Sequence, residues 1–126
     1  MTLRSVLSHA KGLSLAKEGL RHWLLQRLTA LALIPLTFWF VISLIGLVGT
    51  GYNEFIYWLD KPANAAFMIL FLAIAFHHAQ LGMQVIFEDY ISNQFWKTSC
   101  VVIVRLGCYL LMALSIFSIL KIAIGG

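Results

Sequence analysis

The sequence has few charged residues and no stretch that would form a separate soluble domain. Lys, Arg, Asp and Glu make up 11% of the 126 residues, whereas 61% are hydrophobic. The mean hydropathy is +0.90. Soluble domains average about 25% charged and about 45–50% apolar residues. The composition therefore excludes a self-contained soluble enzyme and predicts a single all-α membrane domain over residues 1–126.

Cysteine is scarce as well, and no basic stripe with interleaved aromatic residues is present. Cys100 and Cys108 fall in one apolar run. On a helix they would be about 12 Å apart, which is too far for a disulfide. They do not have metal-ligand spacing, so we interpret them as small residues that face lipid or other helices. The net charge of +4 indicates membrane topology, and the absence of such a basic stripe argues against a nucleic-acid partner.

Three apolar runs, at about 28–49, 63–87 and 98–124, are long enough to cross a hydrocarbon core about 30 Å thick. We expect a short interfacial helix near Leu20–Leu28, before the first span. The basic stretch 1–27 does not have the pattern of a signal peptide, because the apolar run that follows it is long enough to span.

Lys and Arg gather at one side of the predicted bundle. The segment before the first span has five of them, and Lys97 lies in the second loop with Arg105 close by. The first loop and the C-terminus have one each, Lys61 and Lys121. The positive-inside rule therefore places the N-terminus and the second loop on the cytoplasmic or matrix side.

The segment FHHAQLGMQVIFEDYIS, at the end of the second run, is the most informative one. On a helix, Asp89 lies only about 20° from the direction of His78, about 16 Å further along the axis. Gly82 follows His78 by one turn, and Tyr90 follows Asp89. One stripe thus has an imidazole at membrane depth, a small residue, and an acid and a phenol at the inner surface. This pattern suits a flat cofactor in the bilayer beside a polar site.

Histidine inside lipid is expensive and is usually functional. We interpret His78 as a candidate axial ligand of haem b, with the carbonyl of Ile74 as a plausible acceptor for its other ring nitrogen. A histidine that only bonds a neighbouring helix is the alternative. His77 competes for the ligand role but has no glycine one turn on. The two point about 100° apart and cannot bind one iron together, so a second axial ligand would come from another chain.

Other polar residues suggest further parts of a site. Tyr90 could donate a hydrogen bond to a quinone carbonyl, with Asp89 as a proton relay; belt and helix-end roles are the alternatives. Arg27 and His22 precede the first span, where haem propionates would need cations, although positive-inside anchoring also explains basic residues there. Arg105 is a weaker candidate for the same interface.

Two polar arcs on the second span indicate a partner chain. His78 and Gly82 share one arc, and His77, Gln80 and Gln84 occupy another that is roughly opposite. Lipid should contact neither arc. Two other helices do not easily bury both, so we expect an obligate partner.

Two blocks carry a resemblance to a known family: HWLLQRLTA, His22–Ala30, and HAQLGMQVIFEDYI, His78–Ile91. The chain resembles the smaller membrane-anchor subunit, a D-type cytochrome b556 anchor, of succinate dehydrogenase, respiratory complex II. The resemblance implies that His78 is the axial haem b ligand, with the other ligand on a larger cytochrome b anchor. It implies that Tyr90, beside Asp89, binds ubiquinone and that Arg27 lies near the propionates.

The same resemblance implies partners and a place in the cell. A flavoprotein subunit would oxidise succinate, and an iron–sulfur subunit would pass electrons to ubiquinone at the bacterial cytoplasmic or mitochondrial inner membrane. The chain would then serve the tricarboxylic acid cycle without being catalytic alone. A fumarate reductase anchor and a purely structural assembly subunit stay as alternatives. A transporter is disfavoured because the spans show neither broken helices nor an inverted repeat.

Overall fold

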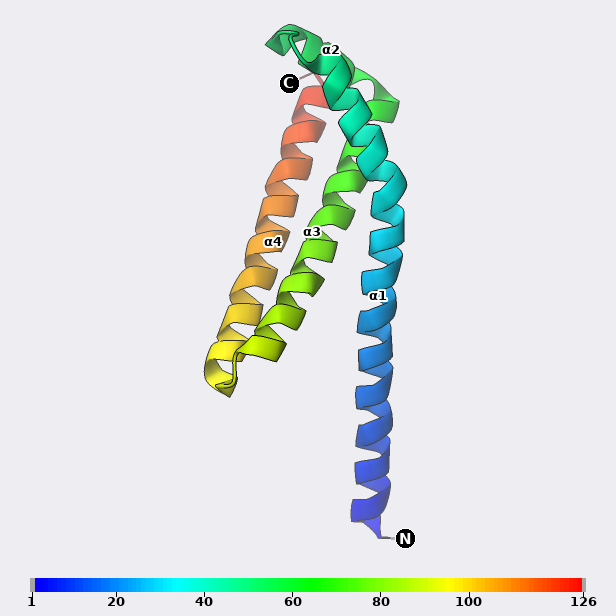
Figure 1. Cartoon of the computed structure of the whole chain (residues 1–126), viewed down its shortest axis with the longest axis vertical. Helices are drawn as coiled ribbons and strands as arrows, with labels where there is room; N and C mark the ends of the chain where they lie inside the picture. The colour runs from blue at the N-terminus through cyan, green and yellow to red at the C-terminus, as the bar shows by residue number, and fades with distance from the viewer. Residues whose placement is uncertain (1, 126) are drawn as a thin grey trace.

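The computed structural model describes residues 2–125, and nearly all of them are helical. α1, α3 and α4 are each long and apolar enough to cross a membrane, whereas α2 is short. This confirms the prediction of an all-α membrane protein with three spans (Figure 1). In chain order the helices are α1, Leu3–Leu47; α2, Tyr52–Asp60; α3, Pro62–Tyr90; and α4, Gln94–Ala123.

The predicted short interfacial helix is wrong, because α1 runs without a break from Leu3 through the first span. Thr2 caps its first turn by accepting the backbone N–H of Ser5 at 3.4 Å. No proline follows until Pro35, and Leu, Ala, Lys, Arg and Glu favour helix throughout the segment. The 45 residues of α1 rise about 68 Å, more than twice the hydrocarbon core. Its first turns therefore extend past α3 and α4 (Figure 1).

Pro35 lies inside α1 without ending it. Proline lacks an N–H and its ring clashes with the carbonyl four residues earlier, so the helix is expected to bend near it. Figure 1 shows α1 changing direction in its cyan part.

Both predicted loops are shorter than expected. The first contains α2, whose start is capped by Glu54, because its Oε2 accepts the Gly51 N–H at 3.1 Å. The second is reduced to residues 91–93, since α3 continues to Tyr90. Asn93 then caps α4 by accepting the Phe95 N–H at 2.9 Å. The loop prediction missed both caps.

α3 is the central helix of the chain. It packs against α4 along most of its length and against α1, whereas α1 and α4 have no comparable contact (Figure 1). The small core of Leu59, Ala65 and Ile119 lies where α2, the start of α3 and the end of α4 meet. The opposite end, where α3 finishes at Tyr90, has no such core among the described residues.

Aromatic rings join α1 to α3 and α2 near the core end. Phe40 stacks on Phe71 with ring centroids 4.7 Å apart. Trp39 stacks on Trp58 at 5.7 Å and meets Phe67 at 5.5 Å. Trp39 is thus the aromatic side chain that connects three helices.

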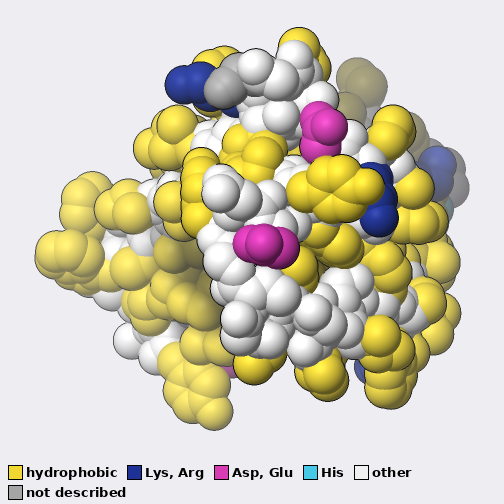
Figure 2. Space-filling view, turned by 90° about the horizontal axis from the view of Figure 1, so that it is seen from above, with side chains coloured by type: hydrophobic (Ala, Val, Ile, Leu, Met, Phe, Trp, Pro, Cys, Tyr) yellow, Lys and Arg dark blue, Asp and Glu magenta, His cyan; other side chains and the backbone are white. Residues whose placement is uncertain are grey.

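Most of the surface is hydrophobic and uncovered. Figure 2, viewed from the α2 end, shows mainly hydrophobic side chains with a few isolated charges. Among residues 2–125 the buried ones are few, and polar Gln80 is one of them: Leu59, Ala65, Gln80, Leu81 and Ile119. Lipid can cover the apolar faces, but the polar ones need protein.

Substitution of Trp39 by Leu should lower stability, because it removes two ring contacts and leaves an apolar side chain. Each aromatic pair contributes about 0.5–1.5 kcal/mol, so the loss should be about 1–3 kcal/mol. Thermal unfolding of the protein purified in mild detergent would measure it as a lower Tm. Phe117→Leu is the control, since Phe117 is 66% exposed. Equal Tm values for the two variants would contradict the aromatic link.

Candidate functional site

His78 lies on the face of α3 that meets α1. It lines an open groove of about 430 Å³ between these two helices. This volume falls within the range of about 300–1,000 Å³ that is common for ligand pockets. The other lining residues all come from α1, and all but the threonine are apolar: Ala30, Leu33, Ile34, Thr37, Phe38 and Val41.

The imidazole of His78 is held from α1 by Thr29. Thr29 Oγ1 lies 2.9 Å from His78 Nδ1. The expected acceptor, the carbonyl of Ile74, is therefore replaced by a side chain from another helix. Thr29 was not among the predicted site residues, because it lies in an apolar run and its partner is 49 residues away in the chain. A hydroxyl on a lipid-depth helix was the only available signal.

Gly82 lies one turn beyond His78 on α3. A Cβ added there would meet only Gln26 Nε2 of α1, at 3.6 Å, which is an ordinary contact. Packing within the described chain therefore does not require glycine at this position. Glycine at this position permits a close approach to the backbone of α3.

Arg27 lies on α1 about one turn before the first residues that line the groove. It precedes Ala30 by three residues and Ile34 by seven, so all three share one face of α1. Its guanidinium lies 5.6 Å from the ring centroid of Trp23 in a cation–π contact. Trp23 thus holds Arg27 at the level expected for an interfacial aromatic residue.

Asp89 and Tyr90 end α3 and do not touch the groove. Both are exposed, and Tyr90 has 85% of its surface accessible. Tyr90 lies about 18 Å along the helix from His78. These two predicted site residues therefore lie on a surface that the described part of the chain leaves exposed.

The second polar arc forms a separate notch of about 880 Å³ between α1, α3 and α4. His77 and Gln80 line it from α3, and His22 lines it from α1. The two arcs thus face different sides, as the helical spacing predicted. His22 is not brought to His78, and its Nε2 is buried without a hydrogen-bond partner among the described residues.

Arg105 also belongs to this notch and not to the groove. It donates to Gln84 Oε1 at 3.2 Å, and Gln84 Nε2 donates to Glu88 Oε1 at 2.9 Å. A guanidinium within a span is thereby linked to a carboxylate near the C-terminal end of α3. This network joins α4 to α3.

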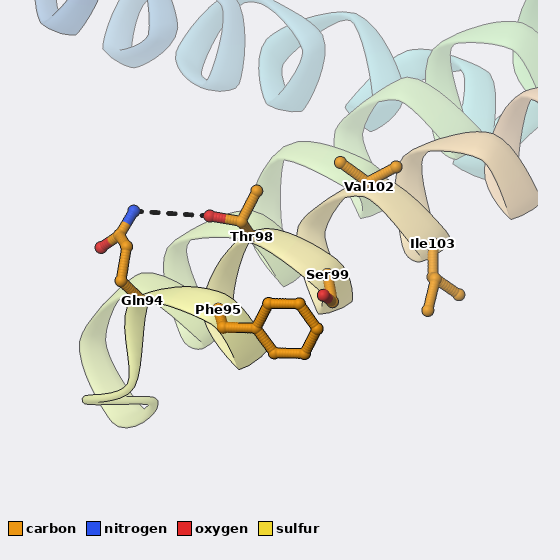
Figure 3. Close-up of a pocket in the computed structure, with 6 residues that line it drawn as sticks. All are labelled: Gln94, Phe95, Thr98, Ser99, Val102 and Ile103. Atoms are coloured by element: carbon orange, nitrogen blue, oxygen red, sulfur yellow. Dashed lines mark hydrogen bonds between the residues drawn. The ribbon is translucent and has the colours of Figure 1, made fainter.

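A shallow hollow of about 680 Å³ lies over the first turns of α4. Figure 3 shows Phe95 and Ile103 pointing away from the other helices, and Gln94 bonding Thr98. Phe95 and Ile103 are 69% and 68% exposed. This apolar surface follows directly after Asp89 and Tyr90 in the chain.

These features define a class of protein: a multi-pass membrane protein with three apolar spans. Across residues 2–125, no three His, Cys, Asp or Glu side chains gather into a metal site. His78 could therefore give a metal only a single ligand, and the groove is open on the side away from this chain.

Sequence comparison gives the family. Residues 1–114 match the family described as "Succinate dehydrogenase/Fumarate reductase transmembrane subunit". The chain belongs to this family.

Its curated relatives carry one printed name, "Succinate dehydrogenase hydrophobic membrane anchor subunit". The protein of Rickettsia conorii (strain Malish 7) is 36% identical over 79% of both chains. That of Rickettsia prowazekii (strain Madrid E) is 34% identical over 80% of this chain and 81% of the relative. That of Paracoccus denitrificans is 24% identical over 92% and 89%. No solved structure matches the chain significantly.

Proposed function

We propose that this chain is the membrane anchor of a succinate dehydrogenase and contributes one axial ligand to haem b and one side of a ubiquinone site. The observation that carries the proposal is His78, which is bound by Thr29 through Nδ1 and lines an apolar groove open to a partner. The family and the printed names of the relatives support the anchor role.

The residues of the groove fit a haem. An apolar wall on α1 suits a flat macrocycle, and His78 presents one imidazole at its edge. Arg27, on the same face as Ala30 and Ile34, would pair with a propionate at the inner surface. His22 lies in the notch and is the weaker candidate for that role. Haem b supplies a one-electron carrier within the bilayer.

The second axial ligand would come from a larger cytochrome b anchor. A single imidazole leaves one axial position open, and the groove has no wall on that side within this chain. The same partner would cover the polar groups that lipid cannot. Haem binding thereby depends on assembly of both anchors.

Tyr90 and Asp89 would form this chain's side of the ubiquinone site. The Tyr90 phenol can donate a hydrogen bond to a quinone carbonyl oxygen, and the Asp89 carboxylate can pass a proton from the aqueous side. Their exposure at the end of α3 leaves them free for a soluble iron–sulfur subunit to cover. A flavoprotein subunit would dock on that subunit in turn.

The long N-terminal part of α1 supports docking on the inner face. Every described residue from Thr2 to Arg21 is exposed. This part carries four of the nine Lys and Arg residues, and its first turns extend past the spans. By the positive-inside rule it faces the cytoplasm of a bacterium or the mitochondrial matrix.

Substitution of His78 by Ala should abolish the low-spin haem spectrum of the purified complex, because no imidazole remains at the groove. The matched control is His77→Ala, which changes the neighbouring histidine in the notch and should keep the spectrum. Difference absorption spectra of the two complexes would decide. An unchanged spectrum in His78→Ala would rule out the ligand assignment.

Substitution of Tyr90 by Phe should lower quinone reduction about 10-fold or more, because the phenolic donor is lost while the ring stays. Succinate oxidation with an artificial dye should persist, since that reaction does not need the membrane site. The control is Tyr52→Phe, a 74% exposed tyrosine at the far end of the bundle. Equal loss of both activities in Tyr90→Phe would argue against a quinone role.

Substitution of Gly82 by Ala should reduce haem content while leaving the chain folded. The added methyl meets nothing closer than 3.6 Å within this chain, and alanine favours helix over glycine by about 1 kcal/mol. Haem per complex, measured as the pyridine haemochrome, should fall. Gly107→Ala is the control, because a Cβ there meets nothing within 4 Å. A normal haem content would show that the haem does not approach Gly82.

A further inference from the structure

The partners of the Thr29 hydroxyl determine the direction of its hydrogen bond with His78. Thr29 Oγ1 lies 2.7 Å from the Leu25 carbonyl oxygen and 3.1 Å from that of Gln26, as well as 2.9 Å from His78 Nδ1. A hydroxyl has one proton and two lone pairs. The direction of the bond to His78 therefore follows from where that proton goes.

The proton of Thr29 must point to the carbonyl oxygens of its own helix. Two carbonyl oxygens within 3.1 Å of a hydroxyl oxygen would repel it if no proton lay between them. Donation to Leu25, four residues earlier, is also the usual bond of a helical threonine. Thr29 then has only lone pairs to offer to His78.

His78 must therefore be the donor, and its Nδ1 carries the proton. A neutral imidazole has one N–H and one free lone pair, so the lone pair is on Nε2. No atom of residues 2–125 forms a hydrogen bond to Nε2. This is the tautomer that a metal ligand needs, and it is set before any metal arrives.

We propose that Thr29 is a positioning residue that holds His78 in the Nδ1–H tautomer and strengthens Nε2 as an electron-pair donor to haem iron. This inference rests on the proposed function, in which His78 is an axial ligand. A hydrogen bond from the ring nitrogen that does not bind the metal orients a ligating imidazole and strengthens it as an electron-pair donor. A stronger donor favours ferric iron, so the contact lowers the reduction potential of the haem.

The source of this hydrogen bond is unusual, because it comes from a different helix. His78 is on α3, whereas Thr29 and the apolar wall of the groove are on α1. The packing of α1 on α3 thus sets both the shape of the groove and the electronic state of the ligand. Movement of α1 by one helical turn would remove Thr29 from His78.

The decisive test compares Thr29→Ala with Thr29→Ser in the assembled complex, because the two substituted side chains differ by one hydroxyl. Thr29→Ala should raise the haem midpoint potential and weaken haem retention about 10–100-fold. Thr29→Ser should keep both near the values of the unmodified complex. Redox titration followed by absorption, and haem loss to an apo-globin acceptor, are the measurements.

Ser118→Ala is the matched control for loss of a helix-internal hydroxyl bond. Ser118 donates to the Leu114 carbonyl at 2.8 Å, the same kind of bond, on α4 and away from the groove. Its removal should change neither the potential nor haem retention. Thr29→Val, which keeps the shape of threonine, should behave like Thr29→Ala.

The outcomes separate this inference from the proposed function. If the unmodified complex holds no haem, or if His78→Ala keeps its spectrum, the proposed function fails. If His78→Ala loses haem but Thr29→Ala and Thr29→Ser have the same potential and retention, only the role of Thr29 fails. Loss of haem in Thr29→Ser as well would also overturn it, since the hydroxyl is still present.

Discussion

The absence of water in the bilayer core is the constraint on which the rest of this structure depends. Backbone groups there must bond within their own helices, so contacts between spans are left to side chains. Within residues 2–125, two side-chain to side-chain hydrogen bonds join separate spans: Thr29 to His78, and Arg105 to Gln84. Both bonds involve α3, the span that carries His78 and Gln84 and lies between α1 and α4.

The two ends of the bundle are built differently. At one end, aromatic stacking around Trp39 and the core around Leu59 hold α1, α2, α3 and α4 together. At the other end, α1 extends away and α3 finishes with exposed Asp89 and Tyr90. A closed end gives this chain its shape, and an open end leaves room for other subunits.

The sequence allowed the spans and the stripe on α3 to be predicted, because helical periodicity places His78 and His77 on different sides without any tertiary information. It did not allow the ends of the helices to be predicted. The long α1 and the short α2 depend on caps at Thr2 and Glu54, which composition alone does not reveal. Thr29 was missed for a stronger reason, since its role exists only once α1 and α3 lie side by side.

The position of α3 between its two neighbours also has a consequence for its polarity. Of the three spans, α3 is the least hydrophobic over its most apolar stretch. Its His78 contacts the Thr29 hydroxyl of α1, and its Gln84 accepts a hydrogen bond from Arg105 of α4. The least hydrophobic span is therefore the one that has a polar partner on each side, so that protein replaces lipid around these polar groups.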